Sequence, residues 1–382
     1  MIYVDNNATT RLADEVAQAL SEAYEAGYLN PSSQHQAGQK ARRRLDDARE
    51  TILNLIGGEI TRFASDRLIF TSGGTEANNL ALFGLGKETG GQVIISAIEH
   101  PSIAEAADQL RSKGTTIRTL PVNSEGVVQY QSLEEWLGEP TRLVSVMMAN
   151  NETGVIQPIS EIAQICSRKE VPLHVDAVQA IGKIPVNFRA LGAAAMTISP
   201  HKFHGPRGIG ALVLDDQVKL NPSMFGGSQQ LAMRPGTESV ELAIGFERAI
   251  QLAIQAMPEA GIQMQKLRDR LETALSEQLG PERITINGAG GVRLPHTSNL
   301  AFPGIDRQAL VMALDMAGVA CSTGSACASG SSEPSPTLLA MGLDEAVVSG
   351  SIRLSLSRFT SEADIDEVAG RISNCVNRLR RR

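Results

Sequence analysis

The chain has little of what marks several classes of protein. It has four cysteines in 382 residues, too few for a disulfide scaffold, so a reducing cytoplasm is the expected location and a functional cysteine is expected to be reactive rather than bridged. No apolar run approaches the roughly 18 residues of a membrane span, and the start lacks the basic and apolar regions of a secretion signal. The net charge is −7, so neither nucleic acid nor a membrane surface is an expected partner.

The middle of the chain alternates short apolar runs with amphipathic stretches, and its length favours two domains. The predicted strands are Arg67–Thr71, Val93–Ser96, Leu143–Met148, His174–Asp176, Met196–Ser199 and Ile209–Leu214. The predicted helices between them are Glu76–Leu85, Ile103–Lys113 and Ile159–Arg168. This alternation predicts an α/β fold with a mostly parallel sheet covered on both faces.

A second unit follows a long helical stretch, Leu242–Leu279, which is a candidate bridge between domains. Its predicted elements are the strands Ser298–Phe302 and Ser351–Leu356, the helix Arg307–Met316, and a last helix capped by Ser361 with Asp364 in the capping-box position.

Two motifs lie where predicted strands end. Thr71–Glu76 runs from a strand through two glycines into a helix, an arrangement that can bind an anion through backbone N–H groups and the helix dipole, although a plain connection is an alternative. Asp176 ends an apolar strand at the edge of the sheet where α/β ligands bind, and a carboxylate buried there needs a cationic partner. Capping of the next helix is the other interpretation of Asp176.

Lysine is scarce, with eight against 27 arginines, and Lys202 lies between a buried strand and a glycine turn in SPHKFHG. A desolvated lysine has a lowered pKa and can form Schiff bases, although a lysine that extends to the surface is the common alternative. A metal site at His201 and His204 is less favoured, because no further ligand stands at a familiar spacing.

Three further residues are candidates for chemistry. Cys327 lies in a loop rich in serine and glycine. A thiol exposed in such a loop is easily oxidised, so its presence there suggests that it has a function. His100, in EHPS, could be a general acid or base, or only a residue at a helix entry. Arg353 lies within a predicted strand in which apolar residues alternate with polar ones. It could bind a carboxylate or simply occupy the solvated face of that strand.

Considered together, these residues have the composition of a pyridoxal phosphate site: an anion cradle, a strand-end aspartate, a lysine in a turn and a histidine before a helix. The lysine bonds the cofactor aldehyde, and the aspartate keeps the pyridine nitrogen protonated.

Along nearly its whole length the sequence resembles the class V aminotransferase superfamily of fold type I pyridoxal phosphate enzymes, and within it the cysteine desulfurases of the NifS/IscS-like group. The motifs that carry the resemblance are YVDNNATT, NPSSQH, FTSGGTEANN, EHPS, MANNETGVIQP, HVDAVQA, SPHKFHGPRG, RPGTESV, STGSACASGSSEPS and SIRLSLSRFT. The resemblance implies a large cofactor-binding domain at 15–257 and a smaller α+β domain made of 1–14 and 258–382, which carries the mobile loop of Cys327.

The resemblance also implies a role for each candidate. Lys202 bonds the cofactor, His100 stacks on its ring and moves protons, Asp176 pairs with the pyridinium, and Gln179 bonds the side of the ring hydroxyl. Asn151 lies near the ring or substrate, and Arg353 binds the substrate carboxylate. The residues that hold the phosphate are Gly74, Thr75, Ser199, His201 and, from the neighbouring subunit of a homodimer, Thr237.

The implied activity is removal of sulfur from L-cysteine, giving L-alanine and a persulfide on Cys327 that passes to an acceptor protein such as an iron–sulfur scaffold. A selenocysteine lyase and an aminotransferase are the alternative enzymes, and a non-catalytic protein that recruits a sulfur-transfer partner is a third interpretation. Two features depart from the pattern: the additional Cys321 beside the loop, and the C-terminal Arg380–Arg382, which leaves the acceptor open.

Overall fold

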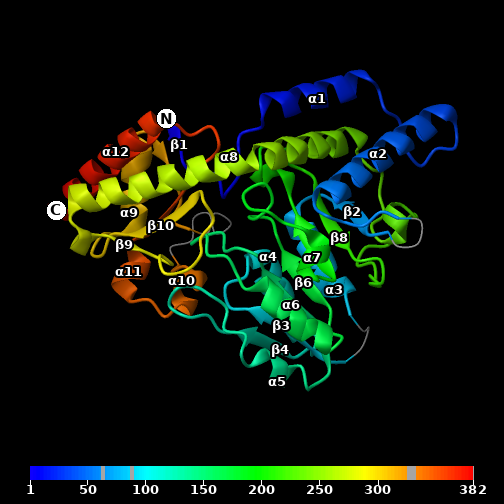
Figure 1. The fold of residues 1–382 in the computed structure, drawn as a ribbon, viewed down its shortest axis with the longest axis horizontal. Coiled ribbons are helices and arrows are strands. Elements are labelled where there is room, and N and C mark those ends of the chain that lie inside the picture. The colour runs from blue at the N-terminus through cyan, green and yellow to red at the C-terminus, as the bar shows by residue number, and fades with distance from the viewer. Residues whose placement is uncertain (62–64, 87–89, 325–332, 382) are drawn as a thin grey trace.

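The larger part of the molecule is built on one twisted sheet (Figure 1). The computed structural model describes residues 1–61, 65–86, 90–324 and 333–381. The sheet has seven strands in the order β2-β8-β7-β6-β5-β3-β4, and all neighbours are parallel except at β8, which is antiparallel to both β2 and β7. Its strands are β2 (Arg67–Thr71), β3 (Gln92–Ser96), β4 (Ile117–Leu120), β5 (Thr141–Met147), β6 (Leu173–Asp176), β7 (Ala195–Ile198) and β8 (Gly210–Leu214).

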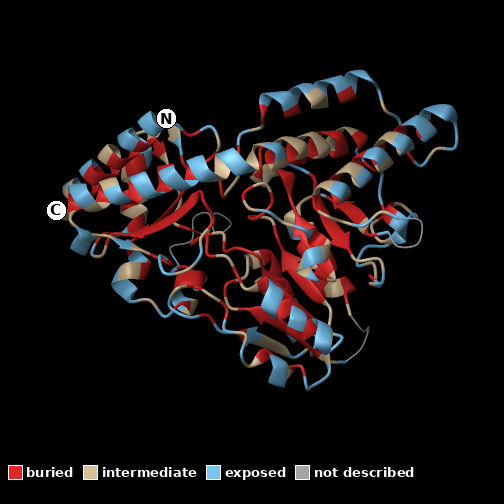
Figure 2. Cartoon of the chain, viewed as in Figure 1, coloured by how far each residue is buried: buried red, intermediate tan, exposed pale blue. Residues whose placement is uncertain are grey.

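Five helices alternate with these strands: α3 (Gly74–Gly84), α4 (Pro101–Ser112), α5 (Leu133–Trp136), α6 (Ile159–Arg168) and α7 (Phe188–Leu191). Two further helices, α1 (Asp14–Glu25) and α2 (Gln36–Leu55), precede β2 and pack against α8 (Val240–Leu279). The central strands are buried along their whole length while the helices expose their outer faces (Figure 2). A strand covered on both faces needs no polar side, so these segments appear in the sequence as continuous apolar runs.

A smaller part lies at the other end of the molecule (Figure 1). Its sheet has the order β12-β10-β9 and is antiparallel, and β1 (Ile2–Tyr3) pairs in parallel with β11 (Val319–Ala320) beside it. The remaining elements are β9 (Thr285–Ile286), β10 (Thr297–Ala301), α9 (Arg307–Met316), α10 (Pro336–Ala340), α11 (Glu345–Ser349), β12 (Ser351–Ser355) and α12 (Glu362–Arg380), together with the short 3-10 turns η1 (Pro200–Lys202), η2 (Gln230–Ala232) and η3 (Pro281–Arg283).

One 40-residue helix, α8 (Val240–Leu279), connects the two parts. It packs against α1 and α2 at one end and against α12 at the other. Its first half contributes side chains such as Phe246 and Ile250 to the core beside the large sheet, and its second half contributes Leu271 and Leu275 to the core of the small part. The helical bridge predicted for Leu242–Leu279 is therefore confirmed.

The predicted elements agree closely with the structure. The strand Arg67–Thr71 and the helices Ile159–Arg168 and Arg307–Met316 have the predicted bounds, and the capping box of Ser361 and Asp364 is present at the start of α12. The prediction omitted β4, the two-residue strands and the helices α1, α5, α7, α10 and α11. Among the described helices, none is both long and apolar enough to cross a membrane.

Candidate active site

A cavity of about 210 Å³ opens at the edge of the large sheet where β6 and β7 end. Its walls come from the turn before α3, the start of α4, and the segments that follow β5, β6 and β7. The lining residues are Ala8, Gly74, Thr75, Asn78, His100, Ser102, Met147, Ala149, Asn151, Asp176, Val178, Gln179, Ser199, His201 and Lys202. Nine of the residues singled out from the sequence, Gly74, Thr75, His100, Asn151, Asp176, Gln179, Ser199, His201 and Lys202, therefore lie around one space.

Lys202 ends the 3-10 turn η1, directly after β7. Its Nζ donates to the carbonyl oxygens of Asn7 at 2.5 Å and Ala8 at 2.8 Å. The interpretation of Lys202 as a lysine that extends to the surface is therefore wrong, because its amine is held inside the fold by main-chain acceptors. The same carbonyl of Asn7 accepts a hydrogen bond from Gln179 Nε2 at 3.1 Å, so the N-terminal segment forms part of the cavity.

Asp176 is the last residue of β6 and is only 6% exposed. Asn78 Nδ2 donates to its Oδ2 at 2.7 Å, and the backbone N–H of Val178 donates to its Oδ1 at 3.0 Å. Among the described residues no lysine, arginine or histidine forms an ion pair with it within 4.0 Å. Uncharged donors from the chain hold this carboxylate, and it lines the cavity, so the cationic partner expected for Asp176 stays a prediction about a bound ligand.

Small and polar residues form another wall of the cavity. A methyl group on Gly74 would lie 3.2 Å from Val178 Cγ2 and 3.6 Å from Ser199 Cβ, so a larger side chain would crowd this wall. Ser199 Oγ is buried and has no hydrogen-bond partner among the described residues. A buried hydroxyl without a partner costs free energy, and a bound ligand would remove that cost.

The neighbouring His201 is also kept uncharged. Burial, together with the positive charges of Lys202 and Arg207, lowers the pKa of His201 to about 4. Its Nδ1 lies 3.1 Å from Thr9 Oγ1. A neutral imidazole in this position can donate to an anion or accept from a hydroxyl without carrying a charge of its own.

His100 caps α4, as the helix-entry interpretation predicts, and it also lines the cavity, while its role as a general acid or base stays a prediction. Its Nδ1 accepts from the backbone N–H of Ser102 at 3.1 Å, which leaves Nε2 to carry the proton of the neutral ring. Burial lowers the pKa of His100; the charge of Asp176 opposes this, while Lys202 and Arg353 reinforce it. A neutral ring with a fixed tautomer can donate from Nε2 near neutral pH.

Arg353 lies on β12 and is 1% exposed, so the interpretation that it occupies a solvated strand face is wrong. Its Nη2 donates to Asp5 Oδ1 at 2.7 Å. Its Nη1 donates to the carbonyl oxygens of Asn151 at 3.0 Å and Gly324 at 2.6 Å. The guanidinium thus joins the N-terminal segment, the cavity wall and the small sheet.

The sequence interpretation missed several residues that support the cavity. Glu99 accepts from the backbone N–H of Met147 at 2.8 Å, and burial raises the pKa of Glu99 to about 8. His174 lies between Ser145 and Thr197, with ring nitrogens 2.9 Å from each hydroxyl oxygen, and burial lowers the pKa of His174 to about 4. The motifs YVDNNATT and HVDAVQA contained Asn7 and His174, but nothing in their spacing showed these contacts.

Two predicted residues lie elsewhere. Thr237 is exposed and does not line the cavity. Cys327 lies outside the described residues, so its placement is not part of the structure. The neighbouring Cys321 is half-buried, and desolvation raises the pKa of its thiol to about 12, which makes it a poor nucleophile.

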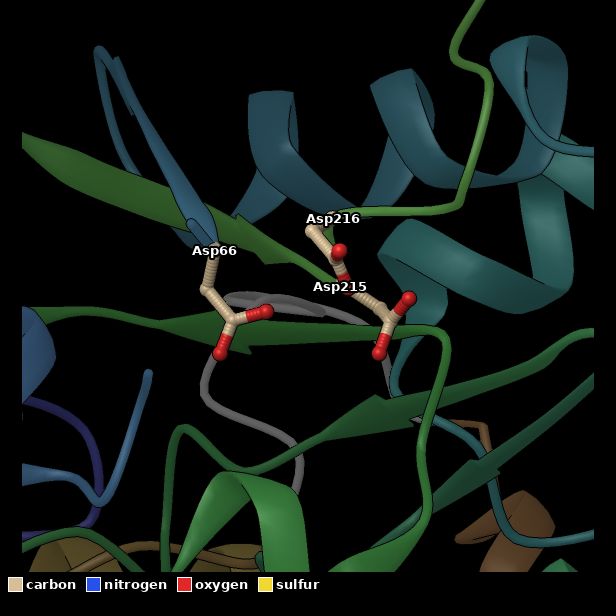
Figure 3. Close-up of side chains that lie close together, drawn as sticks. All are labelled: Asp66, Asp215 and Asp216. Carbon is tan, nitrogen blue, oxygen red and sulfur yellow. The ribbon is translucent and has the colours of Figure 1, made fainter. Parts of the chain in front are cut away.

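A separate acidic cluster lies away from this cavity, at one end of β2 and β8 (Figure 3). Asp66, Asp215 and Asp216 approach one another closely enough to hold a cation. Arg189 already supplies that cation, with nitrogen–oxygen distances of 2.6, 2.8 and 3.0 Å to the three carboxylates. The cluster is an ion-pair network that ties α7 to the sheet.

The mostly parallel sheet places a lysine, an aspartate and a small-residue turn around one cavity at its edge, which is where α/β proteins bind ligands. Residues 2–368 match the family model described as Aminotransferase class-V. A cysteine desulfurase of Nostoc sp. is 40% identical over 382 residues, covering all of this chain and 94% of that protein. The cysteine desulfurase NifS of Azotobacter vinelandii is 36% identical over 381 residues, covering 99% and 93%.

Solved structures agree with these matches. A NifS-like protein from Rickettsia africae superimposes with a TM-score of 0.89 at 34% identity and covers 99% of each chain. The structure described as SspA in complex with cysteine gives a TM-score of 0.79 at 29% identity, covering 94% of this chain and all of the other. The chain belongs to the class-V aminotransferase family, and within it to the group of NifS- and IscS-like cysteine desulfurases.

Proposed function

We propose that this protein is a pyridoxal phosphate-dependent cysteine desulfurase that converts L-cysteine to L-alanine and leaves the sulfur as a persulfide on Cys327. The observation that carries the proposal is the cavity in which Lys202, Asp176 and the partnerless hydroxyl of Ser199 meet. The relatives and the structure with bound cysteine support the choice of substrate.

The cavity residues fit the proposed cofactor. The hydroxyl of Ser199, the N-terminal turn of α3 at Gly74 and Thr75, and His201 offer donors for a phosphate. Asp176 offers a carboxylate to a pyridinium nitrogen, Gln179 an amide to the ring hydroxyl, and Asn151 a polar contact near the ring or substrate. When bound, pyridoxal phosphate withdraws electrons from the substrate and weakens its carbon–sulfur bond.

Lys202 and His100 would move the protons of the reaction. Lys202 would hold the cofactor through its amine, and the same amine would take the proton from the substrate α-carbon. Neutral His100 would have its proton on Nε2 and would donate a hydrogen bond there within the cavity; it would release that proton only when Nδ1 takes up another. The pKa of His100 is lowered by burial, so its neutral form persists below the usual titration range of histidine.

Arg353 would bind the substrate carboxylate. Its Nη1 and Nη2 already donate to Asp5 and to the main-chain carbonyls of Asn151 and Gly324, whereas its Nε is buried with no hydrogen-bond partner among the described residues. An incoming carboxylate would therefore meet one unused donor and would compete with the existing acceptors for the others.

The sulfur transfer itself balances without an added oxidant. The Cys327 thiolate attacks the substrate sulfur, a sulfur–sulfur bond forms as the carbon–sulfur bond breaks, and the carbon fragment takes up protons and leaves as alanine. The persulfide then passes to a thiol of an acceptor protein, for which an iron–sulfur scaffold is a candidate. This chemistry requires reduced thiols, which supports a cytoplasmic location.

We also propose a homodimer in which Thr237 of each subunit reaches the phosphate of the other. The exposed position of Thr237, outside its own cavity, supports this proposal. The proposed domains are 15–257 and 1–14 with 258–382. Two separate cores along α8 support this division, although Ala13 and Leu338 pack with the core of the larger part.

The test is mass spectrometry of the holoenzyme after incubation with L-cysteine. One added sulfur atom is expected on the peptide that contains Cys327, together with one alanine per sulfur transferred. Cys327→Ala should abolish both, whereas the matched variant Cys321→Ala should leave both intact. Unchanged sulfur release by Cys327→Ala would refute the mechanism, and activity on selenocysteine alone would point to a lyase.

A further inference from the structure

A second lysine lies directly behind Lys202. Lys183 follows the turn after β6, is 7% exposed, and its Nζ donates to the backbone carbonyl oxygen of Lys202 at 3.0 Å. Buried lysines are rare, and nearly all of them are paired with a carboxylate. Among the described residues no carboxylate lies within 4.0 Å of Lys183.

The local backbone explains why this carbonyl needs a side-chain donor. The residue four positions after Lys202 is Pro206, which has no N–H. The N–H of Gly205 donates to the carbonyl of Pro200 at 2.9 Å, and His204 has a left-handed backbone with φ of 68°. The turn therefore does not continue as a helix, and Lys183 provides a hydrogen bond that a continuing helix would have provided.

The titratable groups that interact with Lys183 are all basic. The groups that interact with it electrostatically are Lys202, His204, His296 and Arg358. Burial lowers the pKa of Lys183 to about 8, and the charges of Arg358 and Lys202 act in the same direction. Burial also lowers the pKa of both histidines far enough to keep them neutral. Electrostatic interaction is mutual, so a charged Lys183 makes protonation of Lys202 less favourable.

We propose that Lys183 is a positioning residue for Lys202: it holds the carbonyl that ends the turn η1, and its charge favours the uncharged, nucleophilic form of the Lys202 amine. The proposal rests on the role given to Lys202 in the proposed function. It assigns to a residue outside the cavity lining an effect on how readily the protein captures its cofactor.

The experiment measures capture of pyridoxal phosphate by the apoprotein. Apoprotein and cofactor are mixed at a series of pH values, quenched with borohydride, and the modified peptide that contains Lys202 is quantified by mass spectrometry. In Lys183→Met, capture at pH 7 should be about tenfold slower, because both the hydrogen bond and the charge are lost. The midpoint of its pH profile should move upward, because Lys202 then binds its proton more tightly.

Two further variants separate the two effects. Lys183→Gln keeps a donor but not the charge, so its midpoint should move upward with a smaller loss of the maximal rate. Lys183→Arg keeps the charge, so its midpoint should stay near that of the unsubstituted protein. The matched control Lys266→Met replaces an exposed lysine of α8 and should change neither quantity.

Two results would exclude a role of Lys183 in positioning Lys202. Capture by Lys183→Met within twofold of the unsubstituted protein, with the same midpoint, would exclude the role. Equal impairment of the Met and Arg variants, with unmoved midpoints, would show that Lys183 only packs. If Lys183→Met fails to fold, the Gln and Arg variants decide by the same criteria. A complete absence of trapped cofactor on Lys202 in the unsubstituted protein would instead refute the proposed function.

Discussion

The sheet-edge cavity and the surroundings of Arg353 differ in how far their polar groups are already satisfied. In the cavity, Ser199 Oγ is buried without a partner among the described residues, and Asp176 is held by uncharged donors alone. Around Arg353, Nη1 and Nη2 donate to Asp5 and to two main-chain carbonyls, and only Nε is buried without a partner among the described residues. The cavity thus offers unused polar groups to a ligand, whereas a ligand at Arg353 competes with existing contacts for most of the guanidinium donors.

The difference follows from the elements that build each region. The cavity stands at the ends of parallel strands, where β6 and β7 stop at one edge and leave their polar residues facing a common space. Arg353 lies within a strand that pairs with β10 on one side and has an isolated bridge to Ser322 on the other, so it is buried and most of its donors find acceptors within the chain. Substitutions in either region therefore test this difference.

The largest effect is expected at Lys202. Lys202→Ala removes the only amine that lines the cavity of the described structure, so the variant should trap no cofactor with borohydride and should lose desulfuration by on the order of 10³-fold or more. Visible absorbance, trapping and alanine release from cysteine provide the measurements. Retention of a borohydride-stable cofactor adduct in this variant would place the reactive amine elsewhere and remove the cavity from the mechanism.

The next effect is expected at Asp176. Asp176→Asn keeps the shape of the side chain and an acceptor for Val178 but removes the charge offered to a pyridinium. A charge-assisted hydrogen bond contributes about 1.5–3 kcal/mol, so cofactor affinity should fall roughly 10- to 100-fold. Equilibrium dialysis of the apoprotein with pyridoxal phosphate measures this. Equal dissociation constants for the two proteins would mean that the carboxylate has only a structural role.

A smaller and more selective effect is expected at Arg353. Arg353→Lys loses the planar pair of donors, so KM for cysteine should rise about tenfold while cofactor affinity changes less than about twofold. The companion variant Asp5→Asn weakens a competing acceptor and should lower KM a few-fold. If Arg353→Lys also lost cofactor affinity to the same extent, the cavity and the surroundings of Arg353 would not be independent binding regions.

The sequence predicted the sheet and most of the cavity because both depend on local patterns. Apolar runs located the central strands, and residues at strand ends meet at one edge of a parallel sheet, as Gly74, Asp176 and Ser199 do. Contacts between distant segments were not predictable in this way. The carbonyls of Asn7 and Ala8 accept hydrogen bonds from Lys202, which is almost 200 residues away in the sequence. No periodic pattern in the sequence predicts such a contact.

The burial of Arg353 and of Lys183 escaped prediction for a related reason. An arginine within an apolar alternation and a lysine after a turn are equally compatible with solvent when only neighbours in sequence are considered. Tertiary packing decided both, by supplying acceptors for Arg353 and a single backbone carbonyl for Lys183.

The smallest effect concerns the support of the cavity rather than its ligands. Burial lowers the pKa of His174 to about 4, below its value of 6.5 in an unfolded chain. The unfolded state therefore binds a proton first as pH falls, so the stability present above pH 6.5 is lost between pH 6.5 and 4. Between pH 7.5 and 5.0 this one group accounts for about 2 kcal/mol. In His174→Gln, which keeps polar atoms for Ser145 and Thr197, the loss of unfolding free energy in urea over that interval should be smaller by about that amount. An equal loss in both proteins would show that His174 is protonated in the folded state and that the layer beneath Asp176 is open to water.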